Sequence, residues 1–119
     1  MFKRLSTKNG FLSSLRLFST TRSKLVSVEE AVSKVKRGSH VLSGGFGACG
    51  VPNLLIKEIA KQKIDHLHVV TSISSLEDWG VSILLGHNLL DKLTMSYTGN
   101  NKQVVDQYFK GELSLDLIP

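Results

Sequence analysis

A glycine-rich segment over residues 44–52 contains the residues whose types and spacing are best suited to bind a ligand. It reads Gly44-Gly45-Phe46-Gly47-Ala48-Cys49-Gly50-Val51-Pro52. Glycines permit backbone angles and close approaches that a Cβ atom forbids, and successive amides at the start of a helix can meet an anion. The segment is therefore a candidate binding loop for an anionic ligand. The plainer interpretation is a tight turn between a strand and a helix, with no ligand.

The same loop also spells the GxGxxG fingerprint of dinucleotide-binding proteins, through Gly45, Gly47 and Gly50. That fingerprint needs an acidic residue at the end of the second strand, where it binds a ribose hydroxyl. Here the second strand ends in Thr71 and Ser72, and the nearest acidic residue precedes it. The fingerprint is incomplete, and a dinucleotide-binding fragment is kept as an alternative.

Other reactive side chains form no complete site in the sequence. His66 and His68 are expected on one face of a strand, as two metal ligands would be, but no third ligand is apparent and no metal site is predicted. Cys49 has no histidine partner that would make it a nucleophile. We expect Glu77-Asp78 to favour a helix start and Trp79 to lie in the core.

The elements that position the loop alternate between strands and helices. The pattern predicts strands over 40–43, 67–72, 93–97 and 113–118, and helices over 28–37, from Pro52 onward, 79–85 and 102–110. This alternation is typical of an α/β fold with a mainly parallel sheet and crossover helices. Because the last strand runs up to Pro119 with no helix or neighbour to cover it, we expect an incomplete domain.

The first 24 residues differ from the rest in charge. All six basic residues before Glu29 lie there with no acidic residue, whereas from residue 25 onward nine basic residues face ten acidic ones. A Ser- and Thr-rich, acid-free, basic leader is typical of a mitochondrial transit peptide. Residues 16–19, Arg-Leu-Phe-Ser, also resemble a matrix-protease cleavage site. We therefore expect a transit peptide over 1–24, a domain over 25–119, and import into the mitochondrial matrix.

The alternative for this leader is a disordered basic tail or an arm that binds nucleic acid. Its basic residues are mostly single and alternate with Leu and Phe, which argues against a nucleic-acid partner. No apolar run is long enough for a secretory signal or a membrane span. Neither nucleic acid nor membrane is expected as a partner.

The glycine loop resembles the amino-terminal signature of the 3-oxoacid CoA-transferase family: Gly-Gly-Phe, three residues, Gly, any residue and Pro. Further segments resemble the succinyl-CoA:3-oxoacid branch, whose mitochondrial forms carry a leader: Trp79-Gly80, residues 96–101 and residues 107–113. Seven residues match, and the resemblance implies that they shape the acyl or CoA pocket: Gly44, Gly45, Phe46, Gly47, Gly50, Pro52 and Gly99.

The resemblance implies transfer of CoA from succinyl-CoA to a 3-oxoacid such as acetoacetate, in ketone-body catabolism. The family uses a glutamate that attacks the acyl-CoA thioester. No cofactor is expected, because coenzyme A takes part as a thioester substrate. No glutamate of this chain is followed by the family's Glu-x-Gly string, so no catalytic residue is assigned. The expected partners are the acyl-CoA and 3-oxoacid substrates and either the remainder of the transferase or a full-length homologue. The resemblance also implies a homodimer, as in the family. A catalytically silent paralogue is the other alternative.

Overall fold

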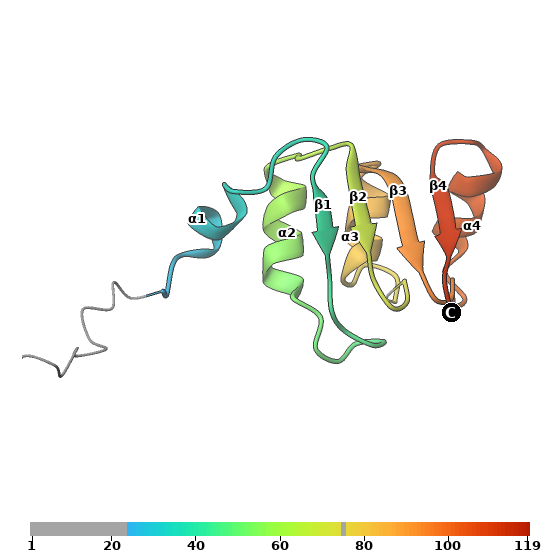
Figure 1. Ribbon diagram of the computed structural model, residues 1–119, viewed down its shortest axis with the longest axis horizontal. Helices are drawn as coiled ribbons and strands as arrows, with labels where there is room; N and C mark the ends of the chain where they lie inside the picture. Colours follow the sequence, from blue (N-terminus) through green and yellow to red (C-terminus); the bar gives the residue numbers. More distant parts are fainter. Residues whose placement is uncertain (1–23, 75) are drawn as a thin grey trace, which may run out of the picture.

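The computed structural model of the chain describes residues 24–74 and 76–119. These residues form four helices and four strands in alternation (Figure 1). In chain order the elements are α1 (Val28–Val32), β1 (His40–Leu42), α2 (Asn53–Lys61), β2 (Leu67–Val70), α3 (Val81–Gly86), β3 (Leu90–Met95), α4 (Lys102–Phe109) and β4 (Ser114–Leu117).

The four strands form one parallel sheet in the order β1-β2-β3-β4. In Figure 1, α2 lies beside β1, α3 lies behind β2 and β3, and α4 lies behind β4. Successive helices also contact one another, from α1 to α4. The predicted α/β class with a parallel sheet and crossover helices is therefore confirmed.

The core lies between the sheet and this helical layer. Alternate residues of the inner strands, such as Leu67, Val69 and Leu93, are buried against Leu84 of α3 and Val104 of α4. Strand side chains alternate between the two faces of a sheet, which places the residues between them on the opposite face. Burial of these aliphatic side chains supplies most of the driving force that holds the four strands in register.

The opposite face of the sheet carries a row of polar side chains. The rings of His40 and His68 pack edge to face with centroids 4.6 Å apart. His68 Nε2 lies 2.8 Å from Thr94 Oγ1, and Lys92 Nζ lies 2.6 Å from Asp116 Oδ2. Among the described helices none is long and apolar enough to cross a membrane.

The two largest differences from the predicted element boundaries are the end of the first helix and the start of the third strand. The first helix ends at Val32 rather than near residue 37, because the chain tightens into a turn in which the Val35 amide donates to the Val32 carbonyl. The third strand starts at Leu90 rather than Leu93. The sequence did not indicate this start, because the exposed side chain of Asp91 interrupts the apolar pattern.

His68 is expected to make the fold sensitive to acid. Burial, followed by the charges of His40 and Lys92, lowers its pKa below the ordinary 6.5, while Asp116 raises it. The unfolded chain therefore binds a proton at His68 before the folded chain does, so stability should fall as pH drops below about 6.5.

We expect His68→Gln to flatten that part of the pH profile, measured as the midpoint of urea unfolding at several pH values. His87→Gln is the control, because His87 is an exposed residue at the end of α3. A His68→Gln profile as steep as that of the wild type would contradict this role of His68.

Candidate functional site

The glycine loop leaves the carboxyl end of β1 and turns back on itself before α2. The Phe46 amide donates to the Cys49 carbonyl at 2.9 Å, and the Cys49 amide donates to the Phe46 carbonyl at 3.0 Å. Gly47 lies in this turn with a φ of +59°, a left-handed angle that favours glycine. The loop is thus a closed hairpin turn whose tip extends from the sheet.

Gly45 is the most constrained residue of this loop. Its φ is +118°, and a Cβ atom built on it would lie 2.6 Å from Cγ2 of Val51 and 3.1 Å from the Val51 backbone. Its carbonyl accepts a hydrogen bond from Ser72 Oγ, which joins the loop to the segment after β2. The backbone here approaches Val51 so closely that only glycine fits.

A pocket of about 630 Å³ opens at the carboxyl edge of the sheet. The tip of the glycine loop meets the segments that follow β2 and β3 there. Its walls are formed by Gly47, Ile73, Ser74, Leu76, Glu77, Tyr97, Gly99, Asn100 and Asn101. Carboxyl ends of parallel strands are where α/β proteins bind their ligands. This pocket is the candidate active site.

Hydrogen bonds hold the two strand-end segments of the pocket together. Ser74 Oγ donates to the Thr98 carbonyl, and Ile73 pairs with Tyr97 in a short parallel bridge. Asn101 is buried at the start of α4, where its Oδ1 accepts from the Gln103 amide at 3.0 Å. These contacts fix the positions of the segments after β2 and β3 that line the pocket. The sequence did not predict them.

Asn101 also joins α4 to α3, since its Nδ2 donates to Ser82 Oγ at 2.7 Å. Asn101→Ala is therefore expected to lower the free energy of unfolding by about 1–3 kcal/mol, because it removes a helix cap and leaves a buried hydroxyl with one partner fewer. Asn100→Ala, at the exposed neighbouring residue, should cost less than about 0.5 kcal/mol. Equal losses in urea unfolding would show that Asn101 has no special structural role.

The seven residues predicted for the acyl or CoA pocket do not all meet in one place. Gly47 and Gly99 lie together in the large pocket, while Gly44 and Gly45 line a shallower hollow of about 380 Å³ at the ends of β1 and β2. Pro52 lines a small apolar gap of about 160 Å³ between α1 and α2. The remaining two, Phe46 and Gly50, line none of these three hollows.

Sequence reasoning missed much of the lining of the large pocket. Ser74 and Leu76 belong to the loop after β2, for which no role was expected, and Glu77 was interpreted as a helix-start residue. Their position at the end of a parallel strand was the available signal. Trp79, predicted to be core, is 37% exposed, and Lys57 Nζ lies 5.9 Å from its ring centroid. The prediction of a buried Trp79 is therefore wrong.

The pocket lining has little charge. Among the described residues that form it, one is acidic, Glu77, and none is a lysine or an arginine. Glu58, whose pKa is lowered by hydrogen bonds from Gln62 and Lys61, is on α2 and outside this lining. The described lining therefore offers no cation to a phosphate or a carboxylate.

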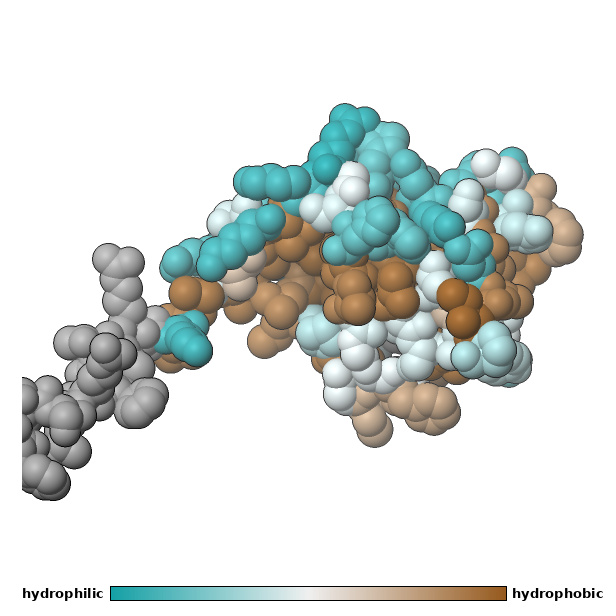
Figure 2. All heavy atoms as spheres, in the orientation of Figure 1, coloured by the Kyte–Doolittle hydropathy of each residue, from teal (hydrophilic) through white to brown (hydrophobic). Residues whose placement is uncertain are grey.

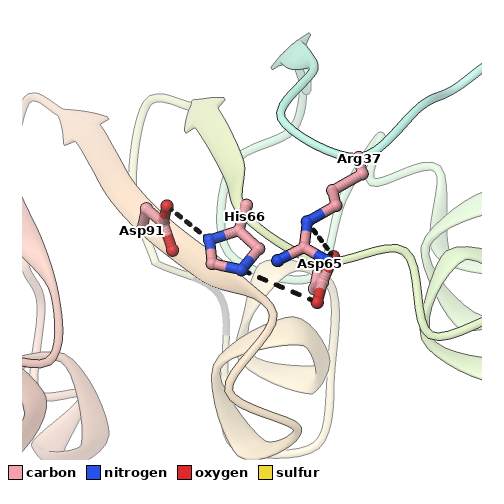
Figure 3. Close-up of polar contacts among 4 residues, drawn as sticks. All are labelled: Arg37, Asp65, His66 and Asp91. Atoms are coloured by element: carbon pink, nitrogen blue, oxygen red, sulfur yellow. Dashed lines mark hydrogen bonds and ion pairs between the residues drawn. The ribbon is translucent and has the colours of Figure 1, made fainter.

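His66 belongs to a different cluster, at the amino edge of the sheet (Figure 3). It precedes β2, and its Nδ1 lies 2.8 Å from Asp91 Oδ2 while its Nε2 lies 3.8 Å from Asp65 Oδ2. Arg37 Nε pairs with Asp65 Oδ1 at 3.3 Å. Whereas His66 contacts Asp91, His68 contacts Thr94 and His40. Within the described residues no group of three or more side chains that could hold a metal ion occurs.

The fold and the pocket define an α/β protein with a candidate ligand site at the carboxyl edge of a parallel sheet. Residues 25–119 match the Coenzyme A transferase family model, and the chain belongs to this family. It is 38% identical over 95 residues, 80% of this chain, to a Bacillus subtilis protein named as one probable subunit of a succinyl-CoA:3-ketoacid coenzyme A transferase. It is also 38% identical over 90 residues, 76% of this chain, to the mitochondrial succinyl-CoA:3-ketoacid coenzyme A transferase 2 of Homo sapiens.

These relatives are longer proteins. The matched part amounts to 40% of the Bacillus subtilis protein and 17% of the human one. A crystal structure of the decarboxylase AibA/AibB, in a cysteine-to-serine variant, superposes with a TM-score of 0.61 at 20% identity, over 76% of this chain and 36% of that one. This structural likeness supports the fold alone.

Proposed function

We propose that this chain forms one wall of the active site of a CoA-transferase that moves CoA from succinyl-CoA to a 3-oxoacid such as acetoacetate. The observation that carries the proposal is the pocket at the carboxyl edge of the sheet, where Gly47 of the signature loop meets Gly99. Two relatives at 38% identity are named for this substrate pair. Glycines at both sides of the opening leave room for an acyl group to approach the backbone.

The proposed chemistry needs a carboxylate nucleophile that the sequence of this chain does not provide. In the proposed reaction, a glutamate attacks the thioester carbonyl, an acyl-glutamyl anhydride forms and the CoA thiolate leaves. The thiolate then attacks the glutamyl carbonyl, which gives a glutamyl thioester and releases the first carboxylic acid. The carboxylate of the second acid attacks this thioester, which expels the CoA thiolate and forms a second acyl-glutamyl anhydride. The thiolate then attacks the acyl carbonyl of that anhydride, which gives the new acyl-CoA and regenerates the glutamate.

A second polypeptide segment is the proposed source of that glutamate. Several relatives, including the Bacillus subtilis protein, are named as one lettered subunit of their enzyme, which points to a companion subunit in those enzymes. In this proposal Glu77 is a pocket residue but no nucleophile, because no Glu-x-Gly string follows it. In this proposal the chain forms one wall of the pocket, and the companion performs the covalent step.

Intact-mass spectrometry after incubation with succinyl-CoA tests this division of labour. With both polypeptides present and the acceptor acid left out, the mass of a bound CoA is expected on the companion subunit. The matched control is the companion with its reactive glutamate changed to glutamine, which should carry no adduct. A CoA or succinyl adduct on a glutamate of this chain would refute the proposed division.

For residues 1–24 we propose a mitochondrial transit peptide, which places the protein in the matrix. The basic, acid-free composition supports this, and mitochondrial relatives exist in Homo sapiens and Mus musculus. The residues in question, apart from Lys24, lie outside the described part of the structure. Residues 1–24 fused to a reporter should be imported by isolated mitochondria, and replacing Arg4, Arg16 and Arg22 by Glu should abolish import. Import of the Glu variant at the normal rate would contradict the proposal.

A further inference from the structure

The side chain of Ile73 lies beside Gly99 in the wall of the large pocket. A Cβ atom built on Gly99 would lie 3.5 Å from Cδ1 and 3.7 Å from Cγ1 of Ile73. Both residues line the pocket of about 630 Å³, and Gly47 of the glycine loop lines it too. Because Gly99 has no side chain, the isoleucine extends over a part of the wall that the glycine leaves open.

Two serine side chains fix the segment that carries Ile73. Ser72 Oγ donates to the Gly45 carbonyl, which ties the segment to the glycine loop. Ser74 Oγ donates to the Thr98 carbonyl, which ties it to the segment after β3. Isoleucine is also stiff at χ1, because its Cβ is branched. The Ile73 side chain is therefore held in place on both sides and forms a firm part of the wall.

The wall around Ile73 favours the apolar part of a ligand. Leu76 and Tyr97, which line the same pocket, are 64% and 58% exposed. In Figure 2 hydrophilic atoms cover the upper margin, where the strands of Figure 1 begin, and hydrophobic atoms reach across the middle and the lower tips. Among the described lining residues Glu77 is the one with a charge. An uncharged acyl tail therefore fits beside Ile73 better than a carboxylate does.

We propose that Ile73 sets the length of the acyl chain that the pocket accepts. The inference rests on the function proposed above, and it narrows the substrate class to 3-oxoacids with a short, unbranched chain whose terminal methyl group lies against Ile73. Alanine in place of isoleucine removes several carbon atoms from the wall and makes room for a longer chain. One methylene gained or lost in an apolar pocket changes the preference between two substrates by roughly 10- to 200-fold.

NMR titration of the full chain, without CoA and without a companion subunit, tests this role. The two probes are acetoacetamide and 3-oxohexanamide, uncharged analogues of a short and a longer 3-oxoacid, because the described lining has no lysine or arginine. Dissociation constants are taken from the shift of the Gly99 amide. We expect the wild type to prefer the short probe, and Ile73→Ala to change the ratio of the two constants by about 10-fold or more in favour of the longer probe.

Three further variants control this measurement. Ile73→Val, a milder truncation, should change the ratio in the same direction by a smaller factor, and it keeps the test valid if the alanine variant does not fold. Ile73→Leu keeps the number of carbon atoms and should keep a ratio close to that of the wild type. Val105→Ala should leave the ratio unchanged, because Val105 is an exposed residue of α4 outside the pocket lining.

Three results would overturn the proposal. These are a ratio that neither truncation of Ile73 changes, an equal change in Val105→Ala, and the absence of a Gly99 shift with either probe in the wild type. Because neither CoA nor a companion subunit is present, the ratio does not depend on catalysis. The expected ratios together with no CoA exchange in the mixture with a companion subunit would uphold the role of Ile73 and refute the proposed function.

Discussion

Gly45→Val is expected to reduce the turnover of the assembled transferase by about 100-fold or more. A Cβ at this residue would lie 2.6 Å from the Val51 side chain and 3.1 Å from the Val51 backbone, and the φ of +118° is strained for any branched residue. The loop must therefore move, and Gly47 at its tip forms part of the pocket wall. A displacement of about 1 Å in a positioning wall costs a factor on the order of 100 in rate.

Steady-state CoA exchange by the complex with the companion subunit measures this loss. Gly111→Val is the matched control: Gly111 also has a positive φ, +74°, but a Cβ there meets nothing within 4 Å, and it lies outside the pocket. That control should lose about 1–3 kcal/mol of stability and keep its turnover. The Gly45 variant should lose at least as much stability, so turnover is compared per mole of folded complex. Unchanged turnover of Gly45→Val would remove the loop from the active site.

Leu93→Ala is expected to lower the free energy of unfolding by about 2–5 kcal/mol, a large share of the total for a small domain. Leu93 has no exposed surface and lies at the centre of β3. Its register partners are Val69 of β2 and Leu115 of β4. Truncation leaves a cavity that the paired strands on both sides prevent from closing, so both the transfer energy and the cavity energy are lost.

Urea unfolding of the chain measures this change, with Leu117→Ala as the control. Leu117 belongs to β4 and is 57% exposed, so the same truncation should cost only about 0.5 kcal/mol. Equal losses at the two leucines would contradict a core that is centred between β3 and the helical layer.

Local signals in the sequence were enough to predict the elements. Ser27 precedes Glu30 by three residues, which is the spacing of a capping box, and its side chain accepts a hydrogen bond from the Glu30 amide at 3.1 Å. Helix α4 begins at Lys102, directly after its cap Asn101. The start of β3 was missed because Asp91 breaks the apolar run. Its carboxylate is instead used in the pair with His66, a contact between segments far apart in the chain.

The candidate site was only partly predictable, for a related reason. The glycine loop can be recognised in the sequence because several glycines lie within a few residues of one another. Ser74 and Tyr97 belong to no such local pattern. They become pocket residues only because β2 and β3 pair and bring Ile73 beside Tyr97. Pairing of parallel strands brings together loops that are far apart in the sequence, so the part of the pocket that these loops form depends on the tertiary structure.

The most direct test of the proposed function is an assay of CoA exchange from succinyl-CoA to acetoacetate, run on the purified chain from residue 25 onward at high concentration. The same assay is repeated in a mixture with the companion subunit. We predict no turnover by the chain alone and turnover in the mixture, because in the proposed division this chain supplies a wall of the pocket and the companion supplies the glutamate. Turnover by the chain alone would contradict this division and would make one of its own carboxylates, with Glu77 in the pocket the first to test, the nucleophile.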